Sequence, residues 1–268
     1  SVKEKAQKDF IEYVKHVWDG FIEGEHHRLF AEKLERVAQG KCKRLIVNMP
    51  PRHTKSEFAS VFFPSWIMGL NPDMKIMQTT HTAELSARFG RKVRNLMDTD
   101  EYKQIFDKVS LSADSKSAGR WETNKGGEYF AAGVGGAITG RGADLLIIDD
   151  PHSEQDALSP TALESAYEWY TSGPRQRLQP GGTIVIVMTR WSTLDLTEKL
   201  IKRMSEDHAD QWEILELPAI LDDDTPLWPG FWKIEELESV KASIPISKWN
   251  AQYMQNPTSE EGALIKRD

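Results

Sequence analysis

The sequence has few of the features that mark secreted, disulfide-stabilised or membrane proteins. Its 268 residues include a single cysteine, Cys42, which excludes an internal disulfide and a multi-cysteine metal site. No apolar run approaches the roughly 20 residues that a membrane-spanning helix needs. The opening segment, SVKEKAQKDF, is polar and contains no apolar signal core. We therefore expect a reduced, cytoplasmic setting and no membrane partner.

The chain also lacks the basic surplus that is common in nucleic-acid-binding domains. Lys and Arg number 34 against 41 Asp and Glu, which gives a net charge of −7. Because neutralisation of phosphates drives affinity for nucleic acid, contact with DNA would have to be local, transient or aided by another domain. One basic run lies on a predicted helix, where Arg88, Arg91 and Lys92 share a face. A solvated helix surface is the alternative interpretation of this run.

Apolar residues follow strand and helix patterns in turn along most of the chain. Nearly continuous apolar runs predict buried strands at 44–48, 75–79, 128–132, 145–149 and 183–189. Helical spacing predicts helices over 4–22, 26–39, 82–98 and 160–177, and another that begins near residue 55. Strands that alternate with helices are typical of a parallel sheet covered on both faces. We therefore predict an α/β fold with a doubly wound, mostly parallel sheet.

A change in composition after Pro218 suggests a boundary. We expect N-terminal helices over 1–40 to pack on a core over 41–218, and a small lid or linker subdomain over 219–268. In that last part a loop rich in turn residues precedes two predicted helices, near 233–243 and 246–255. The sequence ends without an obvious closing element, so we expect the chain to be part of something longer.

A candidate phosphate-binding loop, MPPRHTKS, follows the first predicted strand at 49–56. The usual pattern is G-x4-G-K-[ST], in which the Lys reaches the outer phosphates and the hydroxyl contacts Mg²⁺. Lys55 and Ser56 are in register with it, but Met49 and Thr54 stand where the glycines are usual. The strand–loop–helix context favours a nucleotide loop, with the helix N-terminus adding positive charge. The alternative is a proline-rich turn before a helix. The predicted nucleotide-binding residues are Pro51, Arg52, His53, Thr54, Lys55 and Ser56.

Acidic residues end the predicted strand at 145–149. Asp149 and Asp150 would lie at the carboxyl edge of a parallel sheet, where α/β ligand sites form. One carboxylate can bind Mg²⁺, and the next can orient the attacking water. An ordinary strand end that turns into a loop is the alternative. The presence of Lys55 and Ser56 upstream favours a single nucleotide site to which both segments contribute.

Two further segments are weaker candidates when taken alone. Thr189 and Arg190 end another buried strand, where a hydroxyl and an Arg can sense the γ-phosphate; a simple strand-to-loop exit is the alternative. A Gly-rich loop over 133–142 carries Arg141 just ahead of the Asp149 strand, and glycine lets the backbone approach a phosphate or a neighbouring subunit closely. The His26–His27 pair has no carboxylate or cysteine at metal-ligand spacing, so we interpret it as structural or solvent-facing.

Together these segments resemble the large subunits of tailed-phage terminases, the DNA-packaging motors. The similar stretches are RLIVNMPPRHTKSEFAS, IMQTTHTAELSARFGRKVRNL, GGAITGRGADLLIIDDPHS and IVIVMTRWS, with LELPAI, PLWPGFW and WNAQYMQNP further on. The resemblance extends over about 28–264, and the order and spacing of the segments are more specific than any one motif.

The resemblance implies a helicase-like P-loop NTPase core with an additional strand, a small lid, and a C-terminal nuclease that we expect to be absent here. By position, Lys55 and Ser56 are the Walker A pair and Arg52 is the extra basic residue of that loop. Asp149 is the Mg²⁺-associated acid, and Thr189 with Arg190 is the coupling motif. Many members follow the Mg²⁺ acid with Glu, whereas Asp150 follows here. Either Asp150 orients the water, which we favour, or Glu154 reaches in from the next loop.

The resemblance further implies Mg²⁺-dependent ATP hydrolysis that drives double-stranded DNA into a procapsid. It implies Arg141 as a candidate arginine finger acting on a neighbouring subunit, with Arg190 as a candidate within the same chain. The expected partners are double-stranded DNA, the portal and procapsid, the small terminase subunit, and further copies of the chain in a ring. The expected location is the host cytoplasm at the portal vertex. The alternatives are a helicase-like remodelling ATPase and a non-hydrolysing nucleotide-binding scaffold.

Overall fold

The structure is a computed structural model that describes residues 1–114, 117–138 and 140–258. Thr139 of the Gly-rich loop and residues 259–268 of the predicted linker lie outside the described residues. Within the described part of the chain, no helix is both long and apolar enough to cross a bilayer.

Seven strands of the described residues form one sheet in the order β3-β4-β2-β5-β6-β1-β7. They are β1 (Arg44–Asn48), β2 (Lys75–Thr80), β3 (Arg120–Glu122), β4 (Glu128–Gly133), β5 (Ala143–Asp149), β6 (Leu178–Met188) and β7 (Glu213–Glu216). Every neighbouring pair is parallel except β3 with β4. This confirms the predicted α/β fold, and the edge strands β3 and β7 are additions that the apolar pattern did not predict. The carboxyl ends of β1, β5 and β6 meet at one edge of the sheet.

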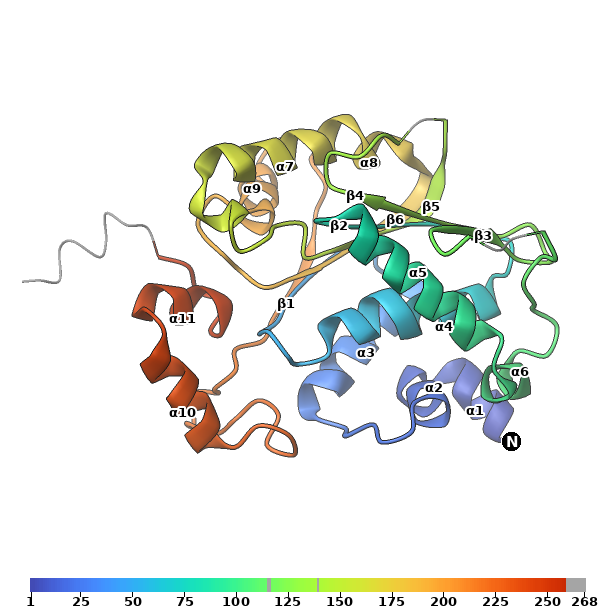
Figure 1. Ribbon diagram of the computed structural model, residues 1–268, viewed down its shortest axis with the longest axis horizontal. Coiled ribbons are helices and arrows are strands. Elements are labelled where there is room, and N and C mark those ends of the chain that lie inside the picture. Colours follow the sequence, from blue (N-terminus) through green and yellow to red (C-terminus); the bar gives the residue numbers. More distant parts are fainter. Residues whose placement is uncertain (115–116, 139, 259–268) are drawn as a thin grey trace, which may run out of the picture.

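Helices cover both faces of the sheet (Figure 1). Val185 and Val187 of β6 pack into a core on the side of α3, α4 and α5, whereas Ile184 and Ile186 pack into a second core under α7 and α9. This alternation explains why the strand is apolar throughout, because each face is buried against helices. The helices of these layers are α3 (Glu25–Ala38), α4 (Phe63–Leu70), α5 (Ala83–Met97), α6 (Asp100–Ile105), α7 (Pro160–Ser172), α8 (Pro174–Arg177) and α9 (Leu196–Arg203), with the π-helical turn η1 (Glu57–Phe62) and the 3₁₀ turn η2 (Asp156–Leu158).

The N-terminal segment forms two helices, α1 (Val2–Lys8) and α2 (Phe10–Val17), so the prediction of one helix over 4–22 is wrong. Asp9 has an extended backbone (φ −117°, ψ 114°), and its side chain caps α2 by accepting a hydrogen bond from the amide of Glu12. A short polar side chain at a helix N-cap favours this break. The predicted helix over 160–177 is likewise divided, because Gly173 separates α7 from α8.

The C-terminal part contains α10 (Ile234–Ser243) and α11 (Ile246–Gln252) and has a small apolar cluster of its own around Ala219, Leu237 and Trp249. It contacts the carboxyl edge of the sheet, where the amide of Arg190 donates to the side chain of Gln255 (3.1 Å). The division of the chain at 218/219 stays a prediction.

Candidate active site

The loop over 49–56 leaves β1 in a conformation that usually requires glycine. Thr54 has φ 70° and Arg52 has φ 62°, both in the left-handed region. Thr54 stands where the Walker pattern has its second glycine, and a β-branched residue is rare in this conformation. Thr54 therefore has the left-handed conformation that a glycine would allow at this position, although it is not a glycine.

Two buried histidines of α3 form hydrogen bonds with the loop over 49–56. The Nε2 atom of His27 lies 2.7 Å from the hydroxyl of Thr54, and its Nδ1 accepts a hydrogen bond from the amide of Gly24. His26 Nε2 donates to the carbonyl of His53 (3.1 Å). Burial lowers the pKa of His26 to about 3 and that of His27 to about 2, so both rings are neutral. The pair is structural rather than solvent-facing, and its contact with the loop is a role that the sequence did not reveal.

Lys55 lies against the acidic end of β5. Its Nζ atom is 2.9 Å from the Oδ2 atom of Asp150, and the residue is only 8% exposed. Burial opposes the charge, but the carboxylates of Asp150 and Asp149 prevail and raise the pKa of Lys55 above its usual value. Lys55 is thus a buried, positively charged lysine near the end of the loop over 49–56.

Ser56 connects the loop to the other carboxylate. Its hydroxyl donates to Oδ1 of Asp149 at 3.0 Å, and the hydroxyl of Ser60 donates to Oδ2 at 2.6 Å. Burial, together with the neighbouring Asp150, raises the pKa of Asp149 to about 7, although Lys55 and the two serines act in the opposite direction. Ser60 is a contact that sequence reasoning missed, because one serine four positions further along a helix carries no distinctive signal.

The end of β6 completes this group. The amide of Thr189 donates to Oδ1 of Asp150 (3.0 Å), and its hydroxyl donates to the carbonyl of Met49 (3.1 Å). Thr189 therefore touches both the acidic strand end and the start of the loop. Lys55, Ser56, Asp149, Asp150 and Thr189 come together at one edge of the sheet, as the sequence predicts for a nucleotide site.

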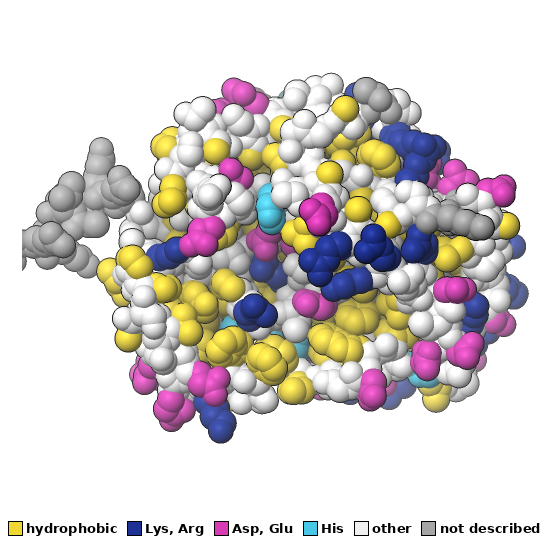
Figure 2. Space-filling view, in the orientation of Figure 1, with side chains coloured by type: hydrophobic (Ala, Val, Ile, Leu, Met, Phe, Trp, Pro, Cys, Tyr) yellow, Lys and Arg dark blue, Asp and Glu magenta, His cyan; other side chains and the backbone are white. Residues whose placement is uncertain are grey.

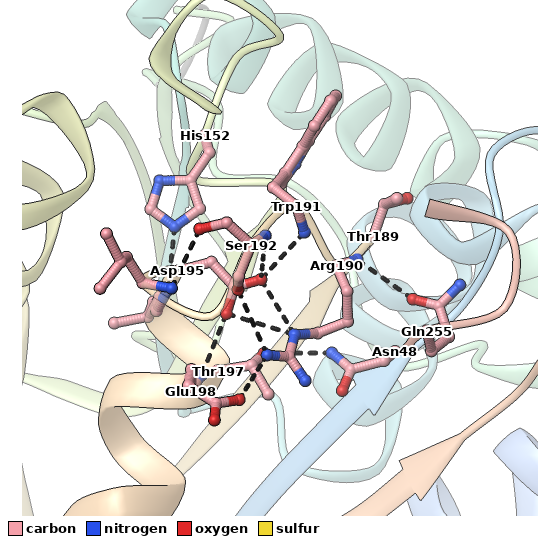
Figure 3. Close-up of polar contacts among 12 residues, drawn as sticks. Asn48, His152, Thr189, Arg190, Trp191, Ser192, Asp195, Thr197, Glu198 and Gln255 are labelled. Carbon is pink, nitrogen blue, oxygen red and sulfur yellow. Dashed lines mark hydrogen bonds and ion pairs between the residues drawn. The ribbon is translucent and has the colours of Figure 1, made fainter. Parts of the chain in front are cut away.

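The side chain of Arg190 points toward Asp195 and Glu198 (Figure 3). Its guanidinium is buried and paired with Asp195 (2.9 Å) and Glu198 (2.6 Å) at the start of α9. To touch a phosphate in its own chain, Arg190 would have to break two ion pairs that satisfy a desolvated charge. The geometry favours a bracing role between β6 and α9.

Two other predicted residues lie outside the group. Glu154 is exposed and paired with Lys248 of α11. Arg141 forms an ion pair with Glu128 at the start of β4, and its Cζ atom lies 4.6 Å from the ring centroid of Phe130. Since β4 and β5 run parallel to the other central strands, Arg141 occupies the amino edge of the sheet, opposite Lys55 and Asp149.

The donor set fits Mg²⁺ only in part. No group of three or more His, Cys, Asp or Glu side chains among the described residues is arranged to hold a metal ion. Ser56 and Asp149 offer oxygen atoms, which Mg²⁺ prefers, and Mg²⁺ commonly combines one or two such ligands with substrate phosphates and water. The buried carboxylate of Asp149 would also be stabilised in its charged form by a cation. The residues present therefore fit an ion shared with a nucleotide, not a protein-only metal cage.

Comparison with known proteins identifies the fold. No family model and no curated protein matches the sequence. The ATPase domain of a Thermus phage large terminase is 13% identical with a TM-score of 0.56, over 92% of this chain and 98% of that one. The HK97 bacteriophage large terminase is 12% identical with a TM-score of 0.55, over 88% of this chain and 51% of that one. The large terminase of a thermophilic bacteriophage in complex with ADP is 12% identical with a TM-score of 0.51, over 83% and 52%.

These matches define the chain first as an α/β domain built on a mostly parallel sheet. More narrowly, the fold is that of the ATPase domain of phage large terminases. The chain spans about half the length of the longer terminases that it matches.

Proposed function

We propose that the chain binds and hydrolyses ATP with Mg²⁺ and that hydrolysis drives double-stranded viral DNA into a procapsid. The observation that carries the proposal is the 3.0 Å hydrogen bond between Ser56 and Asp149, next to the Lys55–Asp150 ion pair. These residues come from two strand ends far apart in the sequence. Their meeting supplies a lysine, a hydroxyl and two carboxylates at the point where a P-loop enzyme needs them.

In this proposal each residue has one task. Lys55 and the loop from Pro51 to Thr54 bind the phosphates, Ser56 and Asp149 face the metal, and Asp150 positions water. Mg²⁺, when bound, would be held by Ser56 and Asp149 and would offset the negative charge that develops on the phosphates during hydrolysis. Thr189 touches the loop and Asp150 together, which supports its role in reporting loss of the γ-phosphate. Catalysis of this kind depends on positioning and charge stabilisation.

Contact with DNA belongs to the proposal as well. Arg88, Arg91 and Lys92 are all exposed on α5. Lys and Arg side chains gather over this helix on the face shown in Figure 2, so a local basic patch exists on a chain whose net charge is −7. Weak phosphate contact of this kind suits a motor that must release its track in each cycle. The proposed partners are double-stranded DNA, the portal and procapsid, the small terminase subunit and further copies of this chain in a ring, at the portal vertex in the host cytoplasm.

The proposal is tested by Lys55→Ala, with Lys108→Ala as the matched control because Lys108 is an exposed lysine remote from the loop. We expect Lys55→Ala to abolish ATP turnover while circular dichroism shows an intact fold, and Lys108→Ala to retain turnover. Near-normal turnover in a folded Lys55→Ala protein would refute the Walker assignment.

The same assay separates the alternative functions. A packaging motor should turn over faster when both double-stranded DNA and procapsid are added. A helicase-like remodelling ATPase should respond to DNA alone, and a nucleotide-binding scaffold should bind ATP without turnover.

A further inference from the structure

Three polar side chains lie in the apolar core between the sheet and the helices that cover it. Ser60 of η1, Gln78 of β2 and Ser86 of α5 are each 0% exposed. Residues beside them in the same elements, such as Phe58 and Ile76, belong to the hydrophobic core. A buried polar group costs free energy unless it is hydrogen-bonded, and an apolar side chain would avoid that cost. Packing alone therefore does not explain why these three positions are polar.

The three side chains form one continuous chain of hydrogen bonds that ends at Asp149. The hydroxyl of Ser86 donates to the side-chain oxygen of Gln78 and lies 3.0 Å from the carbonyl oxygen of the same residue. The Nε2 atom of Gln78 donates to the hydroxyl oxygen of Ser60 (3.2 Å), and the hydroxyl of Ser60 donates to Oδ2 of Asp149 (2.6 Å). A buried polar chain thus connects α5 to the acidic end of β5.

The direction of each hydrogen bond in this chain follows from the carboxylate at its end. An ionised carboxylate can only accept, so the single proton of the Ser60 hydroxyl is directed at Asp149. The oxygen of Ser60 then accepts from the amide nitrogen of Gln78, which leaves the amide oxygen of Gln78 for Ser86. Hydrogen bonds aligned in this way polarise one another, so the contact with Asp149 depends on the residues behind it.

The chain also fixes how the carboxylate of Asp149 is turned. Its Oδ2 atom is bound to Ser60 in the core, whereas its Oδ1 atom is bound to Ser56 of the proposed metal site. Without Ser60 the carboxylate would keep one of these two anchors and could rotate. The other end of the chain lies on α5, which packs against β2 (Figure 1) and whose exposed face carries the basic residues proposed to contact DNA.

We propose that Ser60, Gln78 and Ser86 are positioning residues, whose chain holds Asp149 with Oδ1 available to the metal and makes this orientation depend on the placement of α5. The inference rests on the proposed function and extends it to the orientation of the acid that faces the metal. Hydrogen-bond partners behind a metal ligand commonly change metal affinity by about 10-fold to 100-fold. A movement of α5 on contact with DNA would reach Asp149 through the same chain.

The test measures how much Mg²⁺ strengthens the binding of AMP-PNP, a non-hydrolysable analogue of ATP. Titration calorimetry with Mg²⁺ and with EDTA gives two dissociation constants, and their ratio is the Mg²⁺ gain. We expect Ser60→Ala to lower the Mg²⁺ gain by about 10-fold and to leave metal-free binding unchanged, because Ser60 contacts the carboxylate and not the loop. Gln78→Leu and Ser86→Ala should lower the gain less, since Ser60 keeps its hydrogen bond to Asp149.

The matched control is the loss of another buried hydroxyl. Ser65 of α4 is also 0% exposed, but its hydroxyl donates to the carbonyl of Phe62 (2.8 Å) and does not contact Asp149. Ser65→Ala should therefore leave the Mg²⁺ gain unchanged.

A double variant separates positioning from support of the fold. Ser60→Ala alone leaves the amide nitrogen of Gln78 buried without an acceptor, which should lower the Tm. Addition of Gln78→Leu removes that unsatisfied donor, so the double variant should regain stability and keep the low Mg²⁺ gain. A Mg²⁺ gain that recovers together with the Tm would overturn the inference, because the chain would then only support the fold.

The outcomes also distinguish this inference from the proposed function. An unchanged Mg²⁺ gain in Ser60→Ala would overturn the role of the chain while the proposed function stands. An unchanged gain in both Gln78→Leu and Ser86→Ala would overturn the link to α5, and these two variants decide the question if Ser60→Ala does not fold. If the unaltered protein binds no AMP-PNP, or binds it equally with and without Mg²⁺, the proposed function fails and the inference fails with it.

Discussion

At the end of β5 two adjacent carboxylates have different surroundings. Asp149 is buried between Ser56 and Ser60, whereas Asp150 turns back with φ 41° and pairs with Lys55 and the amide of Thr189. The ion pair between Asp150 and Lys55 supports Asp150 as the residue that orients water. Glu154, by contrast, forms an ion pair with Lys248 at the surface. For Glu154 to contact the attacking water, it would have to leave Lys248 and its loop would have to move.

The two acids can be told apart by amide substitutions. We expect Asp150→Asn to slow turnover by roughly 10²–10⁴ while ATP still binds, because the amide oxygen still accepts from Thr189 but the charge is lost. Glu154→Gln, which removes an exposed ion pair, should change turnover little. Single-turnover rates and nucleotide affinity provide the measurements. A slow, binding-competent Glu154→Gln protein beside an active Asp150→Asn protein would reverse the assignment.

Among the elements, the loop between β1 and η1 is the one whose shape conflicts with its sequence. Thr54 has a side chain branched at Cβ in a left-handed backbone conformation. The hydrogen bond between His27 and the hydroxyl of Thr54 helps to offset the cost of that conformation. Strained backbone of this kind persists only where surrounding contacts over-determine it. The helix α3 that provides this contact is therefore part of the site's support.

Two substitutions at this position measure the strain. Thr54→Ala and Thr54→Gly both remove the hydroxyl, but only Gly also relieves the Cβ. We expect the Gly variant to be more stable than the Ala variant by about 1 kcal/mol, the reverse of the usual order for these residues in regular structure. Urea unfolding curves of the two variants give the difference. An Ala variant as stable as the Gly variant would show that the loop is not held in the left-handed conformation.

At the scale of the whole molecule, the sheet separates Arg141 from the proposed phosphate site at Lys55 and Ser56. Asp149 ends β5, and Arg141 lies ahead of its first residue; a strand of this length spans roughly 20 Å. Arg141 therefore cannot reach the γ-phosphate of its own chain without rebuilding the fold. A neighbouring subunit that places its phosphate site against the amino edge of this sheet would meet the Arg141–Glu128 pair.

This arrangement makes a mixing experiment informative. Arg141→Ala should lower turnover by roughly 10³–10⁵ in the assembled ring, the range for arginine fingers, while a monomer is slow in any case. Mixed with the inactive Lys55→Ala protein under assembling conditions, it should regain part of its activity, since the partner supplies the missing arginine. Each variant assembled alone is the control. No recovery in samples shown to co-assemble means that Arg141 does not serve the neighbouring site and only braces Glu128.

Much of this architecture could be predicted from local pattern. The central strands lie within a few residues of the apolar runs that predict them, because a strand buried on both faces must be apolar at nearly every position. The shared edge of Lys55, Ser56 and Asp149 follows from parallel strands alone. Helix boundaries could not be predicted in the same way. The break at Asp9 depends on one capping contact, and the apolar residues on either side keep a helical spacing across it.

What the sequence alone determined was the α/β class and the order along the chain of the segments proposed to form the phosphate site, since each segment is recognised from residues that are near one another in the chain. The tertiary structure decided the rest. It brought His27 under Thr54, placed Trp228 against Ile22 across a large separation in sequence, and turned Arg190 toward Asp195. The spacing of apolar residues can be read directly from the sequence. The contact partner of a polar or aromatic side chain, by contrast, depends on which elements pack together. Only the packed molecule shows that a threonine occupies a glycine's conformation and that the C-terminal segment lies beside the loop.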